Sequence, residues 1–217
     1  MTESLVDKYF IRTFITGQDK WASSHGSAAG SEDLAAGILY YSFAYATKAK
    51  VCVCLGSGGG FVPRLMCQAQ RDLQIEQAST YLVDGGENVL KEKKDIWGTP
   101  AWSAEGSWHK TNYPDIRVIM NLTERAFYEF FVPNNIRIDY LHIDADHHYE
   151  GVKLDWDLYR MLVTDEGLIT LHDTVNYRHP CGVPRLIDEI RAAGEYSVVN
   201  FPIRYGTALV KKNPVAR

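Results

Sequence analysis

The chain lacks any apolar run long enough to cross a bilayer, so the sequence predicts no transmembrane segment. The start of the chain, Met1–Ser4, also lacks the basic and apolar regions of a secretory signal, and we therefore expect a cytoplasmic protein. Positive charge is not in excess either, because the formal net charge is -4 and the isoelectric point lies near 6.0. This balance argues against a dedicated nucleic-acid or membrane-surface binder.

Cysteine is scarce as well, and none of the four cysteines is paired at the spacing of zinc ligands. Cys52 and Cys54 alternate inside an apparent strand and are interpreted as core thiols of a protein from a reducing compartment. Internal repeats and linker-like stretches are absent. The 217 residues therefore predict one domain, 1–217, with an N-terminal helical cap region over 1–48 and a core over 49–217.

The most informative stretch reads as a strand, a helix and a second strand. Ile138–Ile143 is a short apolar run typical of a buried strand, and a helical pattern follows from Val152 to Leu162. Leu154 is expected among the inward positions of this helix, and Asp155 and Asp157 are expected on its solvated side. Gly167 is expected to stop that helix, before a second apolar run, Leu168–Leu171. A strand-helix-strand order predicts that the two strands are parallel.

Both of these strands end in side chains that handle protons or metal ions. Asp144 and His147 follow the first strand, and His172 and Asp173 follow the second. In open parallel sheets, ligands bind beyond the carboxyl ends of the strands. We therefore expect these side chains to face one crevice and to form the site.

A glycine-rich loop follows an earlier strand, Val51–Leu55, and precedes a helix expected over Phe61–Gln74. Packing is not expected to explain so many glycines, which allow unusual backbone angles and close approach of a ligand to main-chain N–H groups. The strand, loop and helix together predict a nucleotide-cofactor site. Its expected contacts in this loop are Gly56, Ser57, Gly58 and Gly60.

Two further strand ends are candidates for the same cofactor site. Asp84 follows the strand Tyr81–Val83, where an acidic residue can accept hydrogen bonds from ribose hydroxyls; a simple turn aspartate is the alternative, since Asp-Gly is a turn dipeptide. Asn121 follows the strand Ile116–Met120 and is assigned a cofactor contact, with capping of the next helix as its other role.

The two ends of the chain are predicted with less chemical detail. An amphipathic helix is expected over 1–20, and a second helix is expected from Ser31 to Ala46. His25 lies in the small-residue loop between them and is interpreted as a surface histidine. The alternative is that this loop lies over the cofactor mouth and that His25 contributes there. Two strands near the C-terminus, Tyr196–Phe201 and Thr207–Val210, are so close in sequence that they must pair antiparallel.

Taken together, these elements resemble a class I S-adenosylmethionine-dependent methyltransferase. The resemblance implies an α/β fold that is Rossmann-like and doubly wound, with a seven-stranded, mostly parallel sheet and an antiparallel last strand. The motifs L-H-I-D-A-D-H-H-Y-E-G-V-K-L-D and L-H-D-T-V resemble those of macrocin-type O-methyltransferases, which act on sugars and natural products. The resemblance thus implies S-adenosylmethionine as cofactor and a small-molecule hydroxyl as methyl acceptor, with no nucleic-acid or membrane partner; self-association stays open.

The same resemblance assigns roles to the residues at the strand ends. Asp144 and Asp173 match the positions that hold a divalent cation in such enzymes, and the third position falls on His172 or Thr174. Mg²⁺ is implied by the family, whereas an imidazole ligand would favour Mn²⁺, iron or zinc. Asp144 is also expected to contact the cofactor and to take part in catalysis. His147 matches the general base, and its ordinary pKa of about 6.5 suits proton removal at neutral pH.

Three other functions are compatible with parts of the pattern. The D-A-D-H-H cluster is also found in metal-dependent phosphoesterases of the DHH type, which would leave the glycine loop unexplained. A nicotinamide-dependent oxidoreductase should show G-x-G-x-x-G, but Phe61 takes the third glycine position. A protein that binds the cofactor without transferring a methyl group is the remaining alternative.

Overall fold

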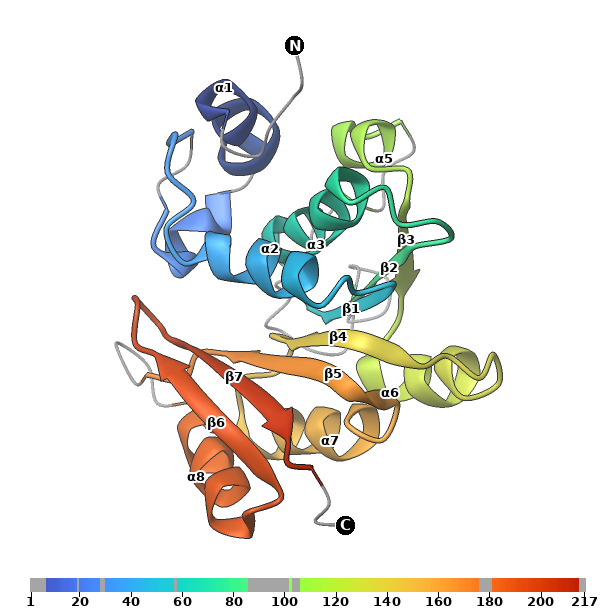
Figure 1. Ribbon diagram of the computed structural model, residues 1–217, viewed down its shortest axis with the longest axis vertical. Helices are drawn as coiled ribbons and strands as arrows, with labels where there is room; N and C mark the ends of the chain where they lie inside the picture. The colour runs from blue at the N-terminus through green and yellow to red at the C-terminus, as the bar shows by residue number, and fades with distance from the viewer. Residues whose placement is uncertain are drawn as a thin grey trace.

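A computed structural model of the chain (Figure 1) describes residues 7–18, 20–27, 30–56, 58–85, 102, 106–175 and 181–214. Seven strands form a single sheet in the order β3-β2-β1-β4-β5-β7-β6. Strands β1 to β5 pair parallel, and β7 runs antiparallel to both β5 and β6. The strands are β1 (Val51–Leu55), β2 (Ser79–Asp84), β3 (Ile116–Met120), β4 (Ile138–Ile143), β5 (Val163–His172), β6 (Tyr196–Phe201) and β7 (Thr207–Lys212). The predicted doubly wound sheet with an antiparallel last strand is confirmed.

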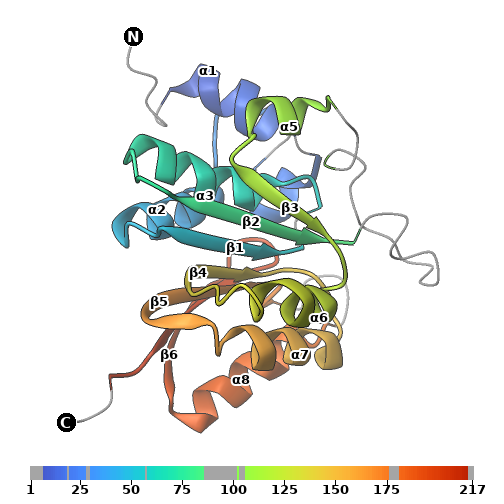
Figure 2. The ribbon, with the colours of Figure 1, turned by 90° about the vertical axis from the view of Figure 1, so that its right-hand side faces the viewer.

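Helices cover both faces of the sheet (Figures 1 and 2). One face carries α1 (Lys8–Phe10), α2 (Gly37–Ala46), α3 (Phe61–Asp72) and α5 (Trp108–Asn112). The other carries α6 (Thr123–Ala126), α7 (Tyr149–Tyr159) and α8 (Val183–Ala193). The remaining helical turns are η1 (Ile11–Ile15), η2 (Thr16–Gln18), η3 (Lys20–His25) and η4 (Phe127–Phe131). None of the described helices is both long enough and apolar enough to span a membrane.

The alternation of side chains along the central strands separates two apolar cores. Val53 and Leu55 of β1 belong to the core shared with α7 and α8, whereas Cys52 and Cys54 face the core shared with α2 and α3. All four of these side chains are fully buried. Cys52 and Cys54 are free thiols, as expected of core residues in this strand.

Several boundaries differ from the sequence prediction. The described part of the helix expected over 1–20 is divided into α1, η1 and η2, and α3 ends at Asp72 rather than at Gln74. Two further differences are larger. The helix expected from Ser31 begins only at Gly37, because Ala35 adopts a left-handed conformation (φ 44°) that interrupts any earlier helix. Gly167 does not stop a helix, since α7 already ends at Tyr159 and β5 starts at Val163. The pairing of β4 with β5 is irregular where β5 begins, and this irregularity hides the strand from a simple apolar pattern.

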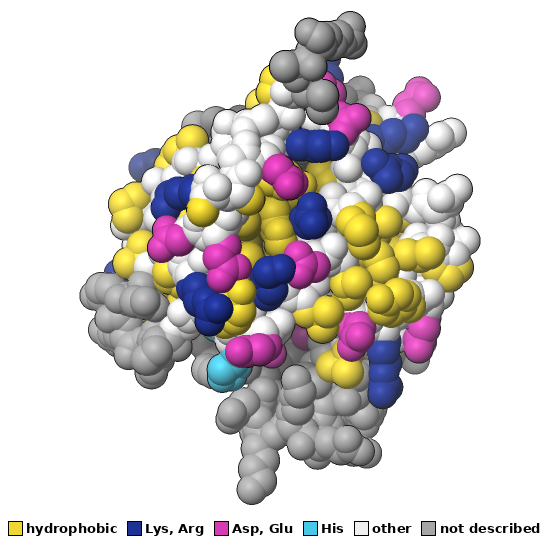
Figure 3. All heavy atoms as spheres, turned by 90° about the horizontal axis from the view of Figure 1, so that it is seen from below, with side chains coloured by type: hydrophobic (Ala, Val, Ile, Leu, Met, Phe, Trp, Pro, Cys, Tyr) yellow, Lys and Arg dark blue, Asp and Glu magenta, His cyan; other side chains and the backbone are white. Residues whose placement is uncertain are grey.

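The lower surface of the molecule carries mixed charge (Figure 3). Lys and Arg side chains lie next to Asp and Glu side chains, and a patch of apolar side chains lies beside them. The described residues on this face form no extended area of one charge, whereas a surface that binds a polyanion would require an extended basic area.

Candidate functional site

The register of the central strands brings three strand ends together. Leu55 pairs with Ile143, and Ile143 pairs with Leu171, so β1, β4 and β5 finish at the same level. The backbone N–H of Asp144 donates to the carbonyl of Leu55 at 2.8 Å, which carries the alignment one residue past the end of β4. Asp144 therefore lies beside the glycine loop on one side and beside the end of β5 on the other.

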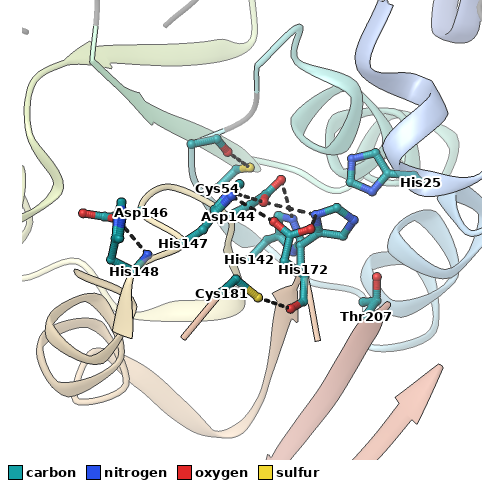
Figure 4. Close-up of polar contacts among 12 residues, drawn as sticks. His25, Cys54, His142, Asp144, Asp146, His147, His148, His172, Cys181 and Thr207 are labelled. Atoms are coloured by element: carbon teal, nitrogen blue, oxygen red, sulfur yellow. Dashed lines mark hydrogen bonds and ion pairs between the residues drawn. The ribbon is translucent and has the colours of Figure 1, made fainter. Parts of the chain in front are cut away.

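Two carboxylates and two imidazoles form a compact group at this edge, which we call the carboxylate–histidine cluster: Asp144, His147, His172 and Asp173 (Figure 4). His172 Nδ1 lies 3.2 Å from Asp144 Oδ1 and 3.4 Å from Asp173 Oδ1. His147 places Nε2 3.5 Å from Asp144 Oδ1 and Nδ1 3.2 Å from Asp173 Oδ2. Each imidazole thus bridges both carboxylates. The crevice expected from the sequence is assembled with these four residues in it.

The charges in the cluster shift the pKa values of its members. Burial alone would raise the pKa of Asp144, but the neighbouring histidines, His172 first, hold it well below its usual range. Burial raises the pKa of Asp173, and the Asp144 charge adds to that effect against the opposing histidines. Burial would lower the pKa of His147, yet the hydrogen bond and charge of Asp144, with the charge of Asp173, raise it to about 9. The imidazoles therefore partly neutralise the carboxylates.

A third histidine lies below the cluster without completing a hydrogen bond to it. His142 is fully buried in β4, and its Nδ1 lies 2.8 Å from the Thr170 hydroxyl. Its Nε2 has no hydrogen-bond partner and lies 3.8 Å from Asp144 Oδ2. Burial lowers the pKa of His142 despite the Asp144 carboxylate. A neutral imidazole thus forms the floor of the site beneath Asp144.

The backbone at the end of β5 is unusual. Asp173 has φ 58°, a left-handed conformation that residues with a side chain rarely adopt. Its carbonyl accepts a hydrogen bond from Cys181 Sγ at 3.1 Å, and the N–H of Val175 donates to Tyr205 at 2.7 Å. These contacts hold a turn that directs the Asp173 carboxylate back toward Asp144. Strained backbone of this kind is concentrated at functional sites in proteins.

The donor atoms of the site fit a divalent cation. One oxygen each from Asp144 and Asp173 and one imidazole nitrogen of His147 all lie within 4.8 Å of one another. A cation bound at ordinary metal–ligand distances can contact three atoms so spaced. His147 completes this donor set, whereas the resemblance placed His172 or Thr174 in third position. His172 lies alongside, with Nδ1 toward the same two carboxylates, and the hydroxyl of Thr174 donates to Asn200 Oδ1 at 2.6 Å.

Protein contacts account for two glycines of the loop, contrary to the expectation that packing would not explain them. A Cβ on Gly56 would overlap the backbone of Asp144 and Ala145, and a Cβ on Gly60 would overlap the ring of Trp102. Both glycines also have positive φ, 71° and 84°, as does Gly58 at 59°. Gly56 therefore lets the segment after β4 cross close over the end of β1, which places Asp144 next to the loop.

The other expected cofactor contacts lie at the same edge of the sheet. Asp84 ends β2 and is buried, at 7% exposure. The N–H of Asn121 donates to the carbonyl of Asp84 at 3.1 Å, and its side-chain amide donates to Glu129 at 3.0 Å. Asn121 is not the cap of α6, whose N-cap is Leu122. Ser57 lies outside the described residues.

The sequence interpretation placed two residues wrongly on the surface. His25 is only 3% exposed, and its ring centroid lies 4.3 Å from that of His172. Asp155 was expected on the solvated side of its helix but is 1% exposed. His25 belongs to an irregular segment without periodicity, so only the folded chain reveals its neighbour. The helix buries Val152, Trp156, Leu158 and Tyr159 as its apolar pattern predicts. The pattern was wrong only at Leu154, which is 39% exposed, and at Asp155, which is buried beside Trp156 in the sequence.

The remaining members of the D-A-D-H-H motif point away from the cluster. His148 is largely exposed, and its Nδ1 lies 2.9 Å from Asp146 Oδ1 (Figure 4). Asp146 also accepts a hydrogen bond from the backbone N–H of His148 at 2.9 Å, at the start of α7. Asp146 and His148 therefore stabilise the beginning of α7 and are not part of the carboxylate–histidine cluster.

Several solved structures share this fold. The Podospora anserina methyltransferase PaMTH1, solved with bound SAH, is 13% identical, with 99% of this chain and 89% of that chain covered and a TM-score of 0.64. The O-methyltransferase TomG from Streptomyces achromogenes, involved in tomaymycin synthesis and solved in complex with SAM, is 12% identical, with 96% of each chain covered and a TM-score of 0.62. The O-methyltransferase from Bacillus cereus, in complex with SAH, is 14% identical, with 97% and 98% covered and a TM-score of 0.61.

At sequence level, no curated protein matches the chain. A family model described as a methyltransferase domain matches residues 53–174. The matched segment contains the glycine loop, Asp84 and the whole carboxylate–histidine cluster, and it spans more than half of the chain. The fold, the strand-end site and this match agree, and the chain belongs to the methyltransferase-domain family.

Proposed function

We propose that the protein is an S-adenosylmethionine-dependent O-methyltransferase that acts on a hydroxyl group of a small molecule such as a sugar, a glycoside or another natural product. The observation that supports it most is the carboxylate–histidine cluster, which lies beside the glycine loop in a methyltransferase fold. Methyl transfer to a hydroxyl needs an acceptor held in line with the donor and a group that takes the proton. The cluster contains both kinds of group.

In this proposal the cofactor lies along the carboxyl edge of β1, β2 and β4. S-adenosylmethionine would supply the methyl group there. Asp84 is placed at the end of β2, where its carboxylate would accept hydrogen bonds from the ribose hydroxyls. The loop from Gly56 to Gly60, with Asn121 and Asp144, would line the rest of the binding surface.

Asp144, Asp173 and one imidazole would hold a divalent cation next to the acceptor. Such a cation would lower the pKa of the acceptor hydroxyl and fix its position. His147 is half exposed and lies at the open side of the cluster, so we assign it as the general base rather than as the third ligand that its distance to the carboxylates would also allow. The charges of Asp144 and Asp173 raise the pKa of His147 to about 9, so the imidazole can act as a base only where a cation neutralises these carboxylates. In that state its Nδ1–H would stay directed at Asp173 Oδ2, and Nε2, which faces Asp144 in the structure, would accept the hydroxyl proton. His172, which is buried, would hold the two carboxylates in place or take the third ligand position.

The alternative functions receive less support. A dinuclear phosphoesterase needs two metal positions, but the residues that the structure describes contain one group of clustered donors. A nicotinamide-binding fold has six parallel strands in the order 3-2-1-4-5-6, whereas here an antiparallel strand lies between β5 and β6. Binding without catalysis would leave the four converging acid–base side chains without a use.

The proposal is tested by offering the purified protein tritium-labelled S-adenosylmethionine with panels of hydroxylated sugars, glycosides and phenols. Label transferred to one class of hydroxyl compound identifies the acceptor. Calorimetry with S-adenosylhomocysteine tests cofactor binding separately, without need of an acceptor. A protein that neither binds S-adenosylhomocysteine nor transfers label would disprove the proposed function.

A further inference from the structure

His25 reaches the site from a part of the chain that lies outside the family match. It closes η3, and its ring lies between Phe61 and His172, of which Figure 4 labels His172. One neighbour is Phe61, the first residue of α3 after the glycine loop, whose ring is stacked at 5.0 Å with an interplanar angle of 16°. The other is His172 of the carboxylate–histidine cluster, at 4.3 Å. A single side chain therefore contacts the cofactor side and the proton-handling side together.

The imidazole of His25 is held by a chain of hydroxyl groups. Its Nδ1 lies 3.0 Å from the hydroxyl of Tyr40, and that hydroxyl lies 2.7 Å from the hydroxyl of Thr207. Thr207 opens β7 and pairs with His172 in the β5–β7 ladder. Thr207 is therefore linked to both histidines: to the side chain of His25 through Tyr40, and to the backbone of His172 through the strand pairing. These links fix the contact between the two rings.

The backbone around His25 is fixed as well. The carbonyl of His25 accepts a hydrogen bond from Ala36 at 3.0 Å, just before α2. Gly26 has φ 88°, and a Cβ there would touch Ala35 and the Ile203–Arg204 turn between β6 and β7. The segment therefore fits closely against the hairpin that carries Thr207.

The choice of residue points to more than packing. Burying an imidazole costs more free energy of desolvation than burying a phenyl ring. If the side chain at position 25 only filled space, Phe would therefore stabilise the protein more than His. Burial, followed by the nearby His172, lowers the pKa of His25 well below its usual value, and the ring is neutral. His172 itself is directed at Asp144 through Nδ1.

We propose that His25 is a positioning residue, which holds the ring of His172 against Asp144 from the N-terminal side of the site. It acts through His172 and does not contact the reacting atoms in this role. The inference rests on the proposed function only in taking Asp144 as part of the catalytic machinery. It implies that residues before the matched domain help to position the side chains of the site.

The experiment uses His25→Phe, which preserves the stack on Phe61 and removes both ring nitrogens. Tyr40 keeps its hydrogen bond to Thr207 in this variant, so no buried hydroxyl loses its last partner. Histidine side chains labelled with ¹⁵N are observed by NMR, with the His172 signals assigned through His172→Gln. His148→Ala is the matched control, because His148 is exposed and pairs with Asp146 away from the cluster.

We expect His25→Phe to shift the His172 imidazole ¹⁵N resonances, and His148→Ala to leave them unchanged. With an acceptor identified, kcat should fall roughly tenfold or more in His25→Phe, while the KM for the acceptor and the affinity for S-adenosylhomocysteine change little. Unchanged His172 resonances together with unchanged kcat would overturn the proposal. His25→Phe keeps only the packing of an aromatic ring, so such a result would show that packing is the only role of His25.

Tyr40→Phe serves if His25→Phe does not fold. It removes the hydroxyl that links His25 to Thr207 and keeps the aromatic ring. We expect a smaller shift of the His172 resonances in the same direction, and no shift would overturn the proposal. Absence of S-adenosylhomocysteine binding by the wild-type protein would instead contradict the proposed function and leave the ring contact to be judged by NMR alone.

Discussion

At the scale of single residues, Asp84 gives the most direct test of the cofactor site. Its carboxylate is buried at the end of β2, where ribose hydroxyls are expected. Asp84→Ala should weaken S-adenosylhomocysteine binding at least tenfold, or about 1.4 kcal/mol, measured by calorimetry. Asp115→Ala is a suitable control, because Asp115 pairs with Arg71 at the opposite end of the sheet. Equal affinity in wild type and Asp84→Ala would remove Asp84 from the site.

His147 is tested by the rate of methyl transfer. Loss of a general base typically costs roughly 10²–10⁴-fold in rate, so His147→Ala should lower kcat by about that factor. The affinity for S-adenosylhomocysteine should stay nearly constant, because His147 faces the two carboxylates and is not part of the glycine loop. Single-turnover measurements would separate this loss from slow product release. A variant that reacts almost as fast as wild type would shift the role to His172.

Asp155 gives a prediction about stability and pH. Burial raises the pKa of its carboxyl to about 7, against the hydrogen bond from Thr123, and Oδ2 has no hydrogen-bond partner. An unfolded aspartate has a pKa near 3.9, so between these two values the unfolded chain has lost a proton that the folded chain keeps. The free energy of unfolding therefore falls as pH rises, by about 1.4 kcal/mol per unit, until pH passes about 7.

The neutral variant Asp155→Asn should remove this dependence. In urea unfolding, the free energy of unfolding of Asp155→Asn minus that of wild type should increase by roughly 2–3 kcal/mol between pH 5 and pH 8. Asp157→Asn, two residues away on the exposed side and ion-paired with Lys153, should show no such growth. If this difference in free energy of unfolding is the same at both pH values, Asp155 is ionised in the folded protein.

At the scale of elements, the turn into α3 depends on Gly60. A Cβ at this position would overlap Trp102, and φ is 84°. Gly194, at the end of α8, has a similar φ of 72° but open space around it. Gly194→Ala should cost about 1–2 kcal/mol of stability from the left-handed backbone alone. Gly60→Ala should cost about 1–3 kcal/mol more, because the ring of Trp102 must move.

Chemical denaturation of both glycine variants measures this difference. Similar losses would show that Trp102 adjusts without cost. Cofactor binding gives a second comparison, because Gly60 adjoins the cofactor loop and Gly194 does not. We expect only Gly60→Ala to weaken S-adenosylhomocysteine binding.

The elements themselves were largely predictable, because each central strand is a short apolar run followed by glycine or a polar residue. The ends of β1, β3 and β4 match the sequence prediction, and these strands position the glycine loop and Asp144. Prediction failed where the backbone departs from regular geometry. The left-handed Ala35 delays α2, and the irregular β4–β5 pairing obscures the beginning of β5. Neither feature can be recognised from the periodicity of hydrophobic residues in the sequence.

The site was predictable to the extent that it follows from strand order. Asp144, His172 and Asp173 meet because parallel strands end at one edge, which is a property of the topology. His25 could not be placed in this way, since its position depends on the long-range hydroxyl contacts of Tyr40 and Thr207, residues 167 positions apart. The contribution of the N-terminal segment to the site therefore becomes visible only in the folded molecule.

At the scale of the whole molecule, a bound cation should stabilise the fold. A ligand that binds only the folded state adds about 2.7 kcal/mol at a concentration one hundred times its Kd. We expect MnCl₂ or MgCl₂ to raise the Tm of the wild-type protein in thermal unfolding, and Asp144→Asn and Asp173→Asn to abolish that rise. Asp188→Asn, on the exposed side of α8, is the control.

EDTA completes this test from the other direction. Removal of the cation should lower both the Tm and the rate of methyl transfer, and added Mn²⁺ or Mg²⁺ should restore both. If EDTA changes neither the Tm nor the activity, the protein is a metal-independent methyltransferase. In that case the imidazoles of His147 and His172 neutralise the carboxylates of Asp144 and Asp173.

The left-handed backbone of Asp173 bears on how the enzyme could be redesigned for industrial use. A non-glycine residue held at φ 58° costs of order 1–3 kcal/mol, and Asp173→Gly would relieve that strain. The same substitution removes a carboxylate from the centre of the site. Directed evolution of this protein should therefore keep position 173 fixed and relieve left-handed backbone elsewhere, for example at Lys48 (φ 50°) or Gln77 (φ 57°).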